Sequence, residues 1–161
     1  MTYASDMDEL LSVRLSRVYD ATPEDIFAAF TEPERIVEWW GPAGIRTSEA
    51  AVDLTPGGEF RVTMCAEDGS YEGPMSGRYI EIDAPTRLVF EITEHCNGAP
   101  HLFDATKLPT TTVTIELRAL DDGRTELTLT HTGFDNAVAA EAHTGGWGTS
   151  LEKLAAAMDA H

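Results

Sequence analysis

The clearest structural signal in the sequence is the stretch TTVTIELRALDDGRTELTLTHTG, residues 111–133. Apolar residues alternate with polar ones over residues 113–117, and the alternation resumes over residues 127–131. A period of two is typical of strands that bury one face. Asp122-Gly123 stands between the two runs and favours a tight turn. The stretch therefore predicts two successive antiparallel strands with one face turned toward a core.

The period changes after Gly133. The apolar residues downstream recur every three or four positions, which is typical of an amphipathic helix, and they are Trp147, Leu151, Leu154 and Met158. We predict a long C-terminal helix that starts between Asp135 and Thr144. Gly145 and Gly146 are unfavourable in such a helix, because glycine costs about 1 kcal/mol relative to alanine. Either the helix begins after them, or they let the backbone approach the sheet closely, or they leave cavity volume.

The chain begins with a strand and two short helices. Alternation predicts a first strand through about Tyr19. Thr22 suits the N-cap of the first helix, and Pro23 suits its first turn. A second short helix is predicted over residues 31–39, where Gly41-Pro42 ends it.

The middle of the sequence is rich in strands. We predict strands near residues 60–64, 71–82 and 88–92, followed by a longer connection over residues 96–110. The whole order predicts an α+β fold, in which a curved antiparallel sheet of about six to seven strands wraps around the long C-terminal helix. Such a layout often leaves a cavity between the sheet and the helix.

Size and charge limit the function. A chain of 161 residues predicts one domain, and we assign residues 1–10 to a frayed N-terminus and residues 11–161 to that domain. With 11 basic and 28 acidic residues the net charge is −17, which argues against a nucleic-acid partner or an anionic membrane. No run approaches the ~20 apolar residues of a membrane span. We expect a cytoplasmic protein in which Cys65 and Cys96 are free thiols.

Several short motifs carry a resemblance to a known family. They are RVYDATP (17–23), WWGP (39–42), VDLTPGGEF (52–60), GRYIEI (77–82), THTGF (130–134) and HTGGW (143–147). Over about residues 12–158 the chain resembles the activator of heat-shock protein 90 ATPase homologue-like branch of the START-like superfamily, also called SRPBCC or the helix-grip fold. The resemblance implies a helix-grip fold with a cavity for a small hydrophobic molecule. Some relatives bind lipids, hormones or polyketides, and others are cyclases or hydrolases.

The leading hypothesis is a domain that binds a small, largely apolar ligand between the sheet and the C-terminal helix. The apolar side chains would form the walls, while His131, Tyr79 and an indole nitrogen would orient the ligand. The predicted ligand-binding residues are Trp39, Trp40, Phe60, Met64, Tyr79, Phe90, Ile115, Leu129, His131, Trp147 and Leu151. We predict no cofactor and no metal site, because His95, Cys96 and His101 offer too few ligands at a defined spacing. No catalytic residue is assigned.

His131 has two interpretations. It is in phase with the leucines of its strand, so it should face inward, where an imidazole needs a hydrogen bond. It is either a ligand-orienting donor or general base, or a structural residue bonded to the C-terminal helix or the Gly133 turn. His143 lies four residues before Trp147 on the same helix face and could meet His131 across the cavity.

Two other classes of function stay open. A cyclase- or hydrolase-like enzyme would use His131 with Glu94 or Tyr79, which must reach a common point. Glu94 is in phase with the apolar residues of its strand and could face inward. A chaperone-interacting module, similar to the heat-shock protein 90 activator, would use the acidic surface and have its cavity filled by side chains. A homodimer also stays open.

Overall fold

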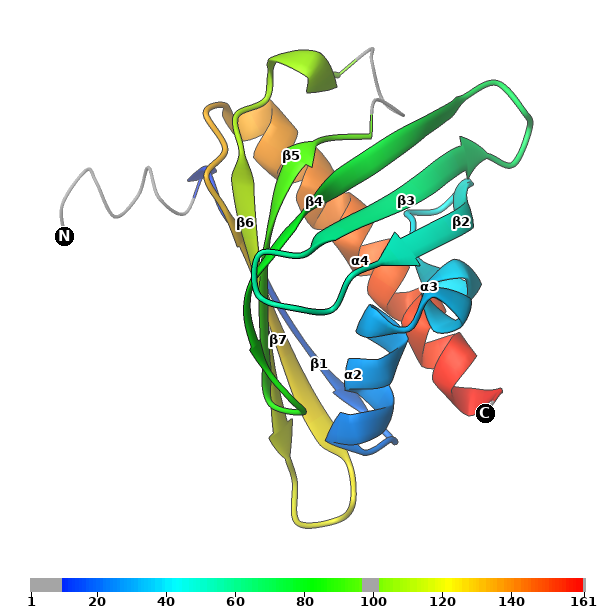
Figure 1. Ribbon diagram of the computed structural model, residues 1–161, viewed down its shortest axis with the longest axis vertical. Coiled ribbons are helices and arrows are strands. Elements are labelled where there is room, and N and C mark those ends of the chain that lie inside the picture. Colours follow the sequence, from blue (N-terminus) through cyan, green and yellow to red (C-terminus); the bar gives the residue numbers. More distant parts are fainter. Residues whose placement is uncertain (1–9, 97–101, 161) are drawn as a thin grey trace, which may run out of the picture.

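The computed structural model describes residues 10–96 and 102–160. Its elements (Figure 1) are, in chain order, β1 (Val13–Tyr19), α2 (Pro23–Thr31), α3 (Pro33–Trp39), β2 (Ile45–Val52), β3 (Glu59–Ala66), β4 (Glu72–Asp83), β5 (Arg87–Glu94), the short 3-10 helix η1 (Ala105–Lys107), β6 (Thr111–Ala119), β7 (Thr125–Thr132) and α4 (Ala137–Asp159). The predicted order of elements is confirmed, and the structure adds the strand β2 and the short helix η1 to it. The predicted frayed N-terminus lies outside the described residues, except for Leu10.

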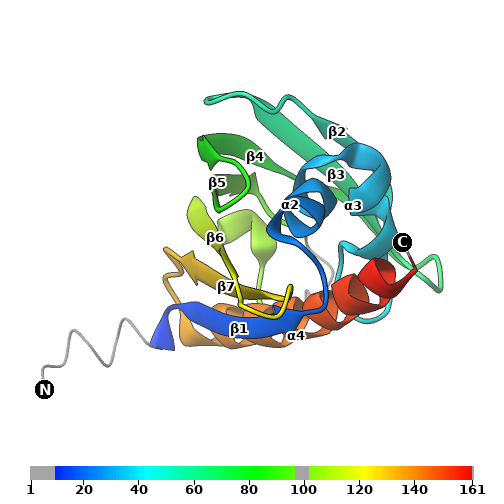
Figure 2. The same cartoon turned by 90° about the horizontal axis from the view of Figure 1, so that it is seen from below.

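The sheet is curled, and the helices close its open side. In the described part of the chain, seven antiparallel strands are ordered β1-β7-β6-β5-β4-β3-β2. Helix α4 packs along β1 at one edge, while α3 packs on α4 and on β2 at the other edge. Figure 2 shows α2 and α3 on the concave side of the sheet. This arrangement confirms the predicted α+β helix-grip fold.

Helix α4 begins within the predicted interval. Asn136 caps it, because the Oδ1 atom of Asn136 accepts a hydrogen bond from the backbone N–H of Ala139 at 2.7 Å. An asparagine at this position satisfies one of the free N–H groups of the first turn. Gly145 and Gly146 therefore lie inside the helix, and the interpretation that the helix begins after them is wrong.

Gly148, also inside α4, gives a stability prediction. A Cβ atom added there would meet one neighbour within 4 Å, the Nη2 atom of Arg17 at 3.9 Å. We expect Gly148→Ala to raise the free energy of unfolding by about 0.5–1 kcal/mol, because alanine has the higher helix propensity and the site has room for it. Urea denaturation followed by circular dichroism measures this change. A lower midpoint for the variant would contradict it.

The sequence pattern does not predict β2. This strand is at the edge of the sheet, where it pairs with β3, and its register shifts between Thr47 and Glu49. Most of its side chains are exposed or half-buried. A shifted, exposed edge strand carries no regular period of two, so the alternation that marks the other strands is missing.

Aromatic side chains build the core between the sheet and the helices. The Trp39 ring packs edge-on against Phe30, with ring centroids 4.8 Å apart, and its Nε1 donates to the carbonyl oxygen of Ala29 at 2.9 Å. Trp40 packs against Trp147 of α4, with ring centroids 5.5 Å apart. These contacts fix α3 between α2 and α4, so that the segment after α3 is held beside α4.

Candidate functional site

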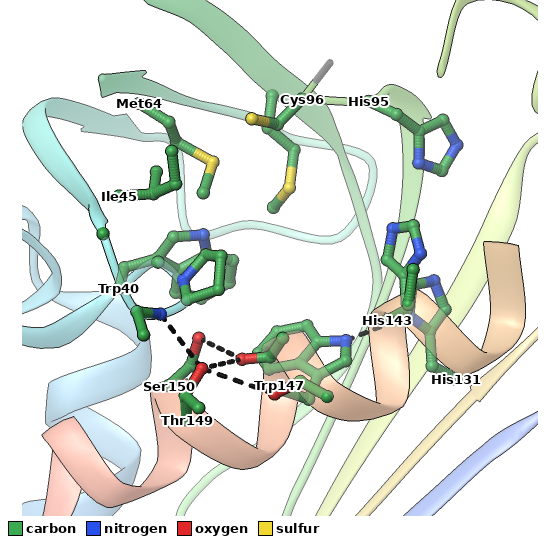
Figure 3. A pocket seen from close by; sticks show the side chains of 18 of the residues that line it. Trp40, Ile45, Met64, His95, Cys96, His131, His143, Trp147, Thr149 and Ser150 are labelled. Atoms are coloured by element: carbon green, nitrogen blue, oxygen red, sulfur yellow. Dashed lines mark hydrogen bonds between the residues drawn. The ribbon is translucent and has the colours of Figure 1, made fainter. Parts of the chain in front are cut away.

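A pocket of about 460 Å³ lies between α4 and the sheet and is partly open to solvent. Figure 3 shows the residues around it. Its walls are mostly apolar and come from the segment after α3, from β3 to β5 and the residues that follow them, from β7, and from α4. The lining residues are Trp40, Gly41, Pro42, Ala43, Gly44, Ile45, Met64, Met75, Ile92, His95, Cys96, Leu102, Phe103, His131, Glu141, Ala142, His143, Gly145, Gly146, Trp147, Thr149 and Ser150. The position agrees with the cavity expected from the sequence.

The segment between α3 and β2 forms one wall and is tied to α4 by hydrogen bonds. The Nζ atom of Lys153 donates to the carbonyl oxygens of Gly41 and Ile45, both at 2.9 Å. The backbone N–H of Ala43 donates to Thr149 Oγ1 at 3.0 Å. Burial lowers the pKa of Lys153. These bonds give the pocket a wall with a fixed position.

Gly145 and Gly146 give α4 a face without side chains toward the pocket. A Cβ atom at Gly146 would lie 3.5 Å from the Cβ of Pro42, and one at Gly145 would meet no atom within 4 Å. Larger side chains at these positions would therefore occupy pocket space. The interpretation that the glycines leave cavity volume agrees with this geometry.

His131 lies on the inner wall of the pocket, and each of its two ring nitrogens has a hydrogen-bond partner in the protein. The indole Nε1 of Trp147 donates to His131 Nδ1 at 3.0 Å, and His131 Nε2 lies 2.7 Å from the hydroxyl of Thr111. Because the indole N–H can only donate, Nδ1 accepts and Nε2 carries the proton of a neutral ring. Burial, and then the neighbouring His143 and His95, lower the pKa of His131 well below its usual value. The bond to Trp147 is the link to the C-terminal helix that the structural interpretation of His131 expected, whereas the bond to Thr111 of β6 was not expected.

Two further histidines stand beside His131 on the same wall. The His143 ring lies 5.5 Å from the His131 ring and 6.2 Å from the His95 ring, measured between centroids. His143 Nδ1 lies 2.8 Å from the carbonyl oxygen of Ala139, and His95 Nε2 lies 3.0 Å from that of Pro109. Burial is the main cause that lowers the pKa of both rings. His143 does lie next to His131, as the sequence analysis considered, but the two rings are on one wall and do not face each other across the cavity.

The histidines do not make a metal centre with the groups around them. Within residues 10–96 and 102–160, no group of three or more His, Cys, Asp and Glu side chains is arranged to hold a metal ion. His101, which the sequence analysis considered with His95 and Cys96, lies outside the described residues.

The predicted ligand-binding residues fall into three groups. Those that line the pocket are Trp40, Met64, His131 and Trp147. Those that surround a much smaller void of about 10 Å³, which Trp40 also borders, are Phe60, Tyr79 and Phe90. Those that lie in the packed core, away from both spaces, are Trp39, Ile115, Leu129 and Leu151.

Other lining residues were not among the predicted ones. The segment from Gly41 to Ile45 carries a visible signal, since Gly41-Pro42 ends a helix and forces an irregular path. Phe103 and Cys96 lie around the long connection, where no period indicates which side chains face inward. Met75 faces the pocket from a strand that contains Pro74, which obscures the alternation there.

The expectation that Glu94 could face inward is wrong, because its side chain lies on the outer surface of the sheet. The register between β4 and β5 shifts so that Ser76 pairs with Glu94 while Gly77 pairs with Ile92. The extra residue turns Glu94 to the outer surface, where it accepts a hydrogen bond from Ser76 Oγ at 2.9 Å and pairs with Arg61 at 3.4 Å. Glu94 therefore does not share a site with His131.

Tyr79 is the other acid–base partner considered for His131. Its side chain is buried beside the small void and does not line the pocket. Burial raises the pKa of the Tyr79 hydroxyl, so the group stays protonated. Neither of the two suggested partners meets His131 in the pocket.

Within the described residues, none of the helices combines the length and the apolar character that crossing a bilayer requires.

The family model described as Activator of Hsp90 ATPase homolog 1-like protein matches residues 20–159. No curated protein matches the chain.

Several solved structures are similar over nearly their whole length. Protein CV1439 from Chromobacterium violaceum is 28% identical with a TM-score of 0.76, and the match covers 91% of this chain and 95% of that one. Protein NE0264 from Nitrosomonas europaea is 26% identical with a TM-score of 0.75, covering 94% and 96%. An AHSA1 protein from Silicibacter pomeroyi is 25% identical with a TM-score of 0.74, covering 92% and 97%.

Proposed function

Because the chain belongs to the Activator of Hsp90 ATPase homolog 1-like protein family, we propose that it binds a small hydrophobic molecule as a START-like (SRPBCC) domain. The observation that carries this proposal is the open, mostly apolar pocket of about 460 Å³ between α4 and the sheet. Ligand pockets in proteins commonly have volumes of about 300–1,000 Å³ and few polar groups. The aromatic faces of Trp40 and Trp147 supply contact area for such a molecule.

The pocket favours this function over the two alternatives. A chaperone-interacting module was expected to have its cavity filled by side chains, whereas this one is open. An enzyme built on His131 would need a free ring nitrogen and a nearby acid, but both nitrogens of His131 are bonded and Glu94 faces outward.

We also propose that residues 11–161 form a single domain. Cys65, a buried cysteine outside any disulfide, supports our proposal of a cytoplasmic location.

The proposal is tested by titrating the neutral fluorophore N-phenyl-1-naphthylamine into the native, monodisperse protein. We expect saturable binding at one site, with energy transfer from tryptophan, because Trp40 and Trp147 line the pocket. Near-ultraviolet circular dichroism checks that the protein keeps its packed core, since loosely packed states also bind apolar dyes. No saturable binding by the native protein would refute the proposal.

A matched pair of variants locates the bound fluorophore. Gly146→Leu places an added side chain at the pocket wall, whereas Gly148→Leu adds the same side chain on α4 at a position that does not line the pocket. We expect Gly146→Leu to weaken binding about tenfold or more and Gly148→Leu to leave it within about twofold. Equal affinity of the two variants would place the fluorophore elsewhere.

A further inference from the structure

His143 and His95 each have one ring nitrogen without a hydrogen-bond partner among the described residues. A carbonyl oxygen can only accept, so His143 Nδ1 donates to Ala139 and His95 Nε2 donates to Pro109. In a neutral imidazole the second nitrogen carries a lone pair and acts as an acceptor. The free acceptors are therefore His143 Nε2 and His95 Nδ1.

Both acceptors are accessible from the pocket. No hydrogen bond joins either nitrogen to another residue in the part of the chain that the structure describes. Both rings line the pocket, and Figure 3 shows His95 above His143 on one wall.

The surroundings keep the two rings neutral near pH 7. Burial lowers the pKa of each ring, and His95 contributes further to the lowered pKa of His143. The titratable groups that line the same pocket are His131, Cys96 and Glu141, of which Glu141 is exposed. His131 presents no free nitrogen to a ligand, because both of its nitrogens are bonded.

We propose that this pocket selects apolar molecules that carry a neutral hydroxyl group, which donates to His143 Nε2 or His95 Nδ1. The apolar body would lie against Trp40, Ile45 and Met64 on the other walls. A hydrocarbon of the same shape would remove water from the two acceptors without replacing its hydrogen bonds. A carboxylate would present only acceptor atoms to the lone pairs of neutral rings.

This inference rests on the proposed function and names the ligand class for the same pocket. It is tested with three probes of one shape: 2-naphthol, 2-methylnaphthalene and 2-naphthoate, each displacing N-phenyl-1-naphthylamine at pH 7.5. The naphthol hydroxyl is neutral there, as a phenol with a pKa of about 10. We expect 2-naphthol to bind about fivefold tighter than 2-methylnaphthalene, the effect of one net hydrogen bond, and tighter than 2-naphthoate. Equal affinities of 2-naphthol and 2-methylnaphthalene would overturn the inference.

Variants assign the selectivity to the two rings. We expect the double variant His95→Leu, His143→Leu to lose the preference for 2-naphthol, and His143→Gln, which keeps an acceptor oxygen, to retain part of it. Ile45→Val is the control, because it trims the apolar wall and should change the affinities for 2-naphthol and 2-methylnaphthalene alike. A double variant that folds and keeps the full preference would overturn the inference.

Acidification tests the same nitrogens without any substitution. Lowering the pH from 7.5 to 5.5 increases the protonated fraction of each ring, which then donates at both nitrogens, while 2-naphthoate stays ionised. We expect its affinity to rise relative to that of 2-methylnaphthalene, and an unchanged ratio would count against the inference. The two proposals fail separately: absence of fluorophore binding refutes the proposed function, whereas equal displacement by all three probes refutes only the hydroxyl selectivity.

Discussion

Replacing His131 with leucine is expected to lower the free energy of unfolding by about 2–4 kcal/mol. His131 is completely buried, and the substitution leaves two buried partners without their hydrogen bonds, the indole N–H of Trp147 and the hydroxyl of Thr111. An unpaired buried polar group costs about 1–3 kcal/mol. Urea denaturation at pH 7.5 measures the loss. A cost below about 1 kcal/mol would contradict the structural role that we assign to His131.

A double-mutant cycle separates the indole contact from other effects of the substitution. In Trp147→Phe the donor to His131 Nδ1 is removed, and in the double variant both partners of that bond are absent. We expect the double variant to lose less stability than the sum of the two single variants, by about 1 kcal/mol or more. Additive losses would show that the bond contributes nothing.

His131 also makes the stability of the protein depend on pH. Its pKa in the folded protein is well below 6.5, so between that lowered value and pH 6.5 the unfolded chain binds a proton that the folded protein does not. Stability therefore falls as the pH drops through this window, and above the window His131 adds no dependence of stability on pH. We expect His131→Leu to reduce the loss of stability between pH 7.5 and 5.5, by on the order of 1 kcal/mol. An identical pH dependence in both proteins would contradict the lowered pKa.

Leu129→Ala is expected to destabilise the protein by about 3 kcal/mol and to leave fluorophore binding intact. Leu129 is fully buried on β7, where it pairs with Leu15 of β1 and Ile115 of β6, away from the pocket. Removing a buried leucine side chain leaves a cavity and costs about 2–5 kcal/mol. Denaturation and fluorophore titration of the same preparation measure the two effects.

Met64→Ala is the matched comparison for Leu129→Ala. Met64 lines the pocket, so its side chain already lacks packing partners on one side. We expect a smaller loss of stability than for Leu129→Ala, together with weaker fluorophore binding. Weaker binding by the folded Leu129→Ala protein would place the ligand in the core, contrary to the pocket described above.

The fold could be predicted because most elements carry strong local signals. Alternation marks β6 and β7, a period of three to four marks α4, and Thr22 with Pro23 marks the start of α2. The edge strand β2 could not be predicted, because its register shift and its exposure remove the alternation. Where pairing with a neighbouring strand sets the structure, a local pattern is not sufficient.

The site could be predicted only in part, because alternation separates inward from outward side chains but not core from cavity. Leu129 and His131 are in phase on β7 and both face inward, yet only His131 reaches the pocket wall. Glu94 follows the phase of β5 but turns outward at the register shift with β4. The free nitrogens of His95 and His143 depend on which carbonyl each ring meets, and the sequence does not contain that information.

The indole N–H signals of the three tryptophans, followed by nuclear magnetic resonance during a titration with 2-naphthol, give the sharpest test of the pocket. Trp40 and Trp147 line it, whereas Trp39 is buried and donates to Ala29 outside it. We expect the signals of Trp40 and Trp147 to shift to saturation while that of Trp39 stays in place. If all three signals stay unmoved at high 2-naphthol, or if Trp39 shifts as far as the other two, the pocket between α4 and the sheet is not where an apolar ligand binds.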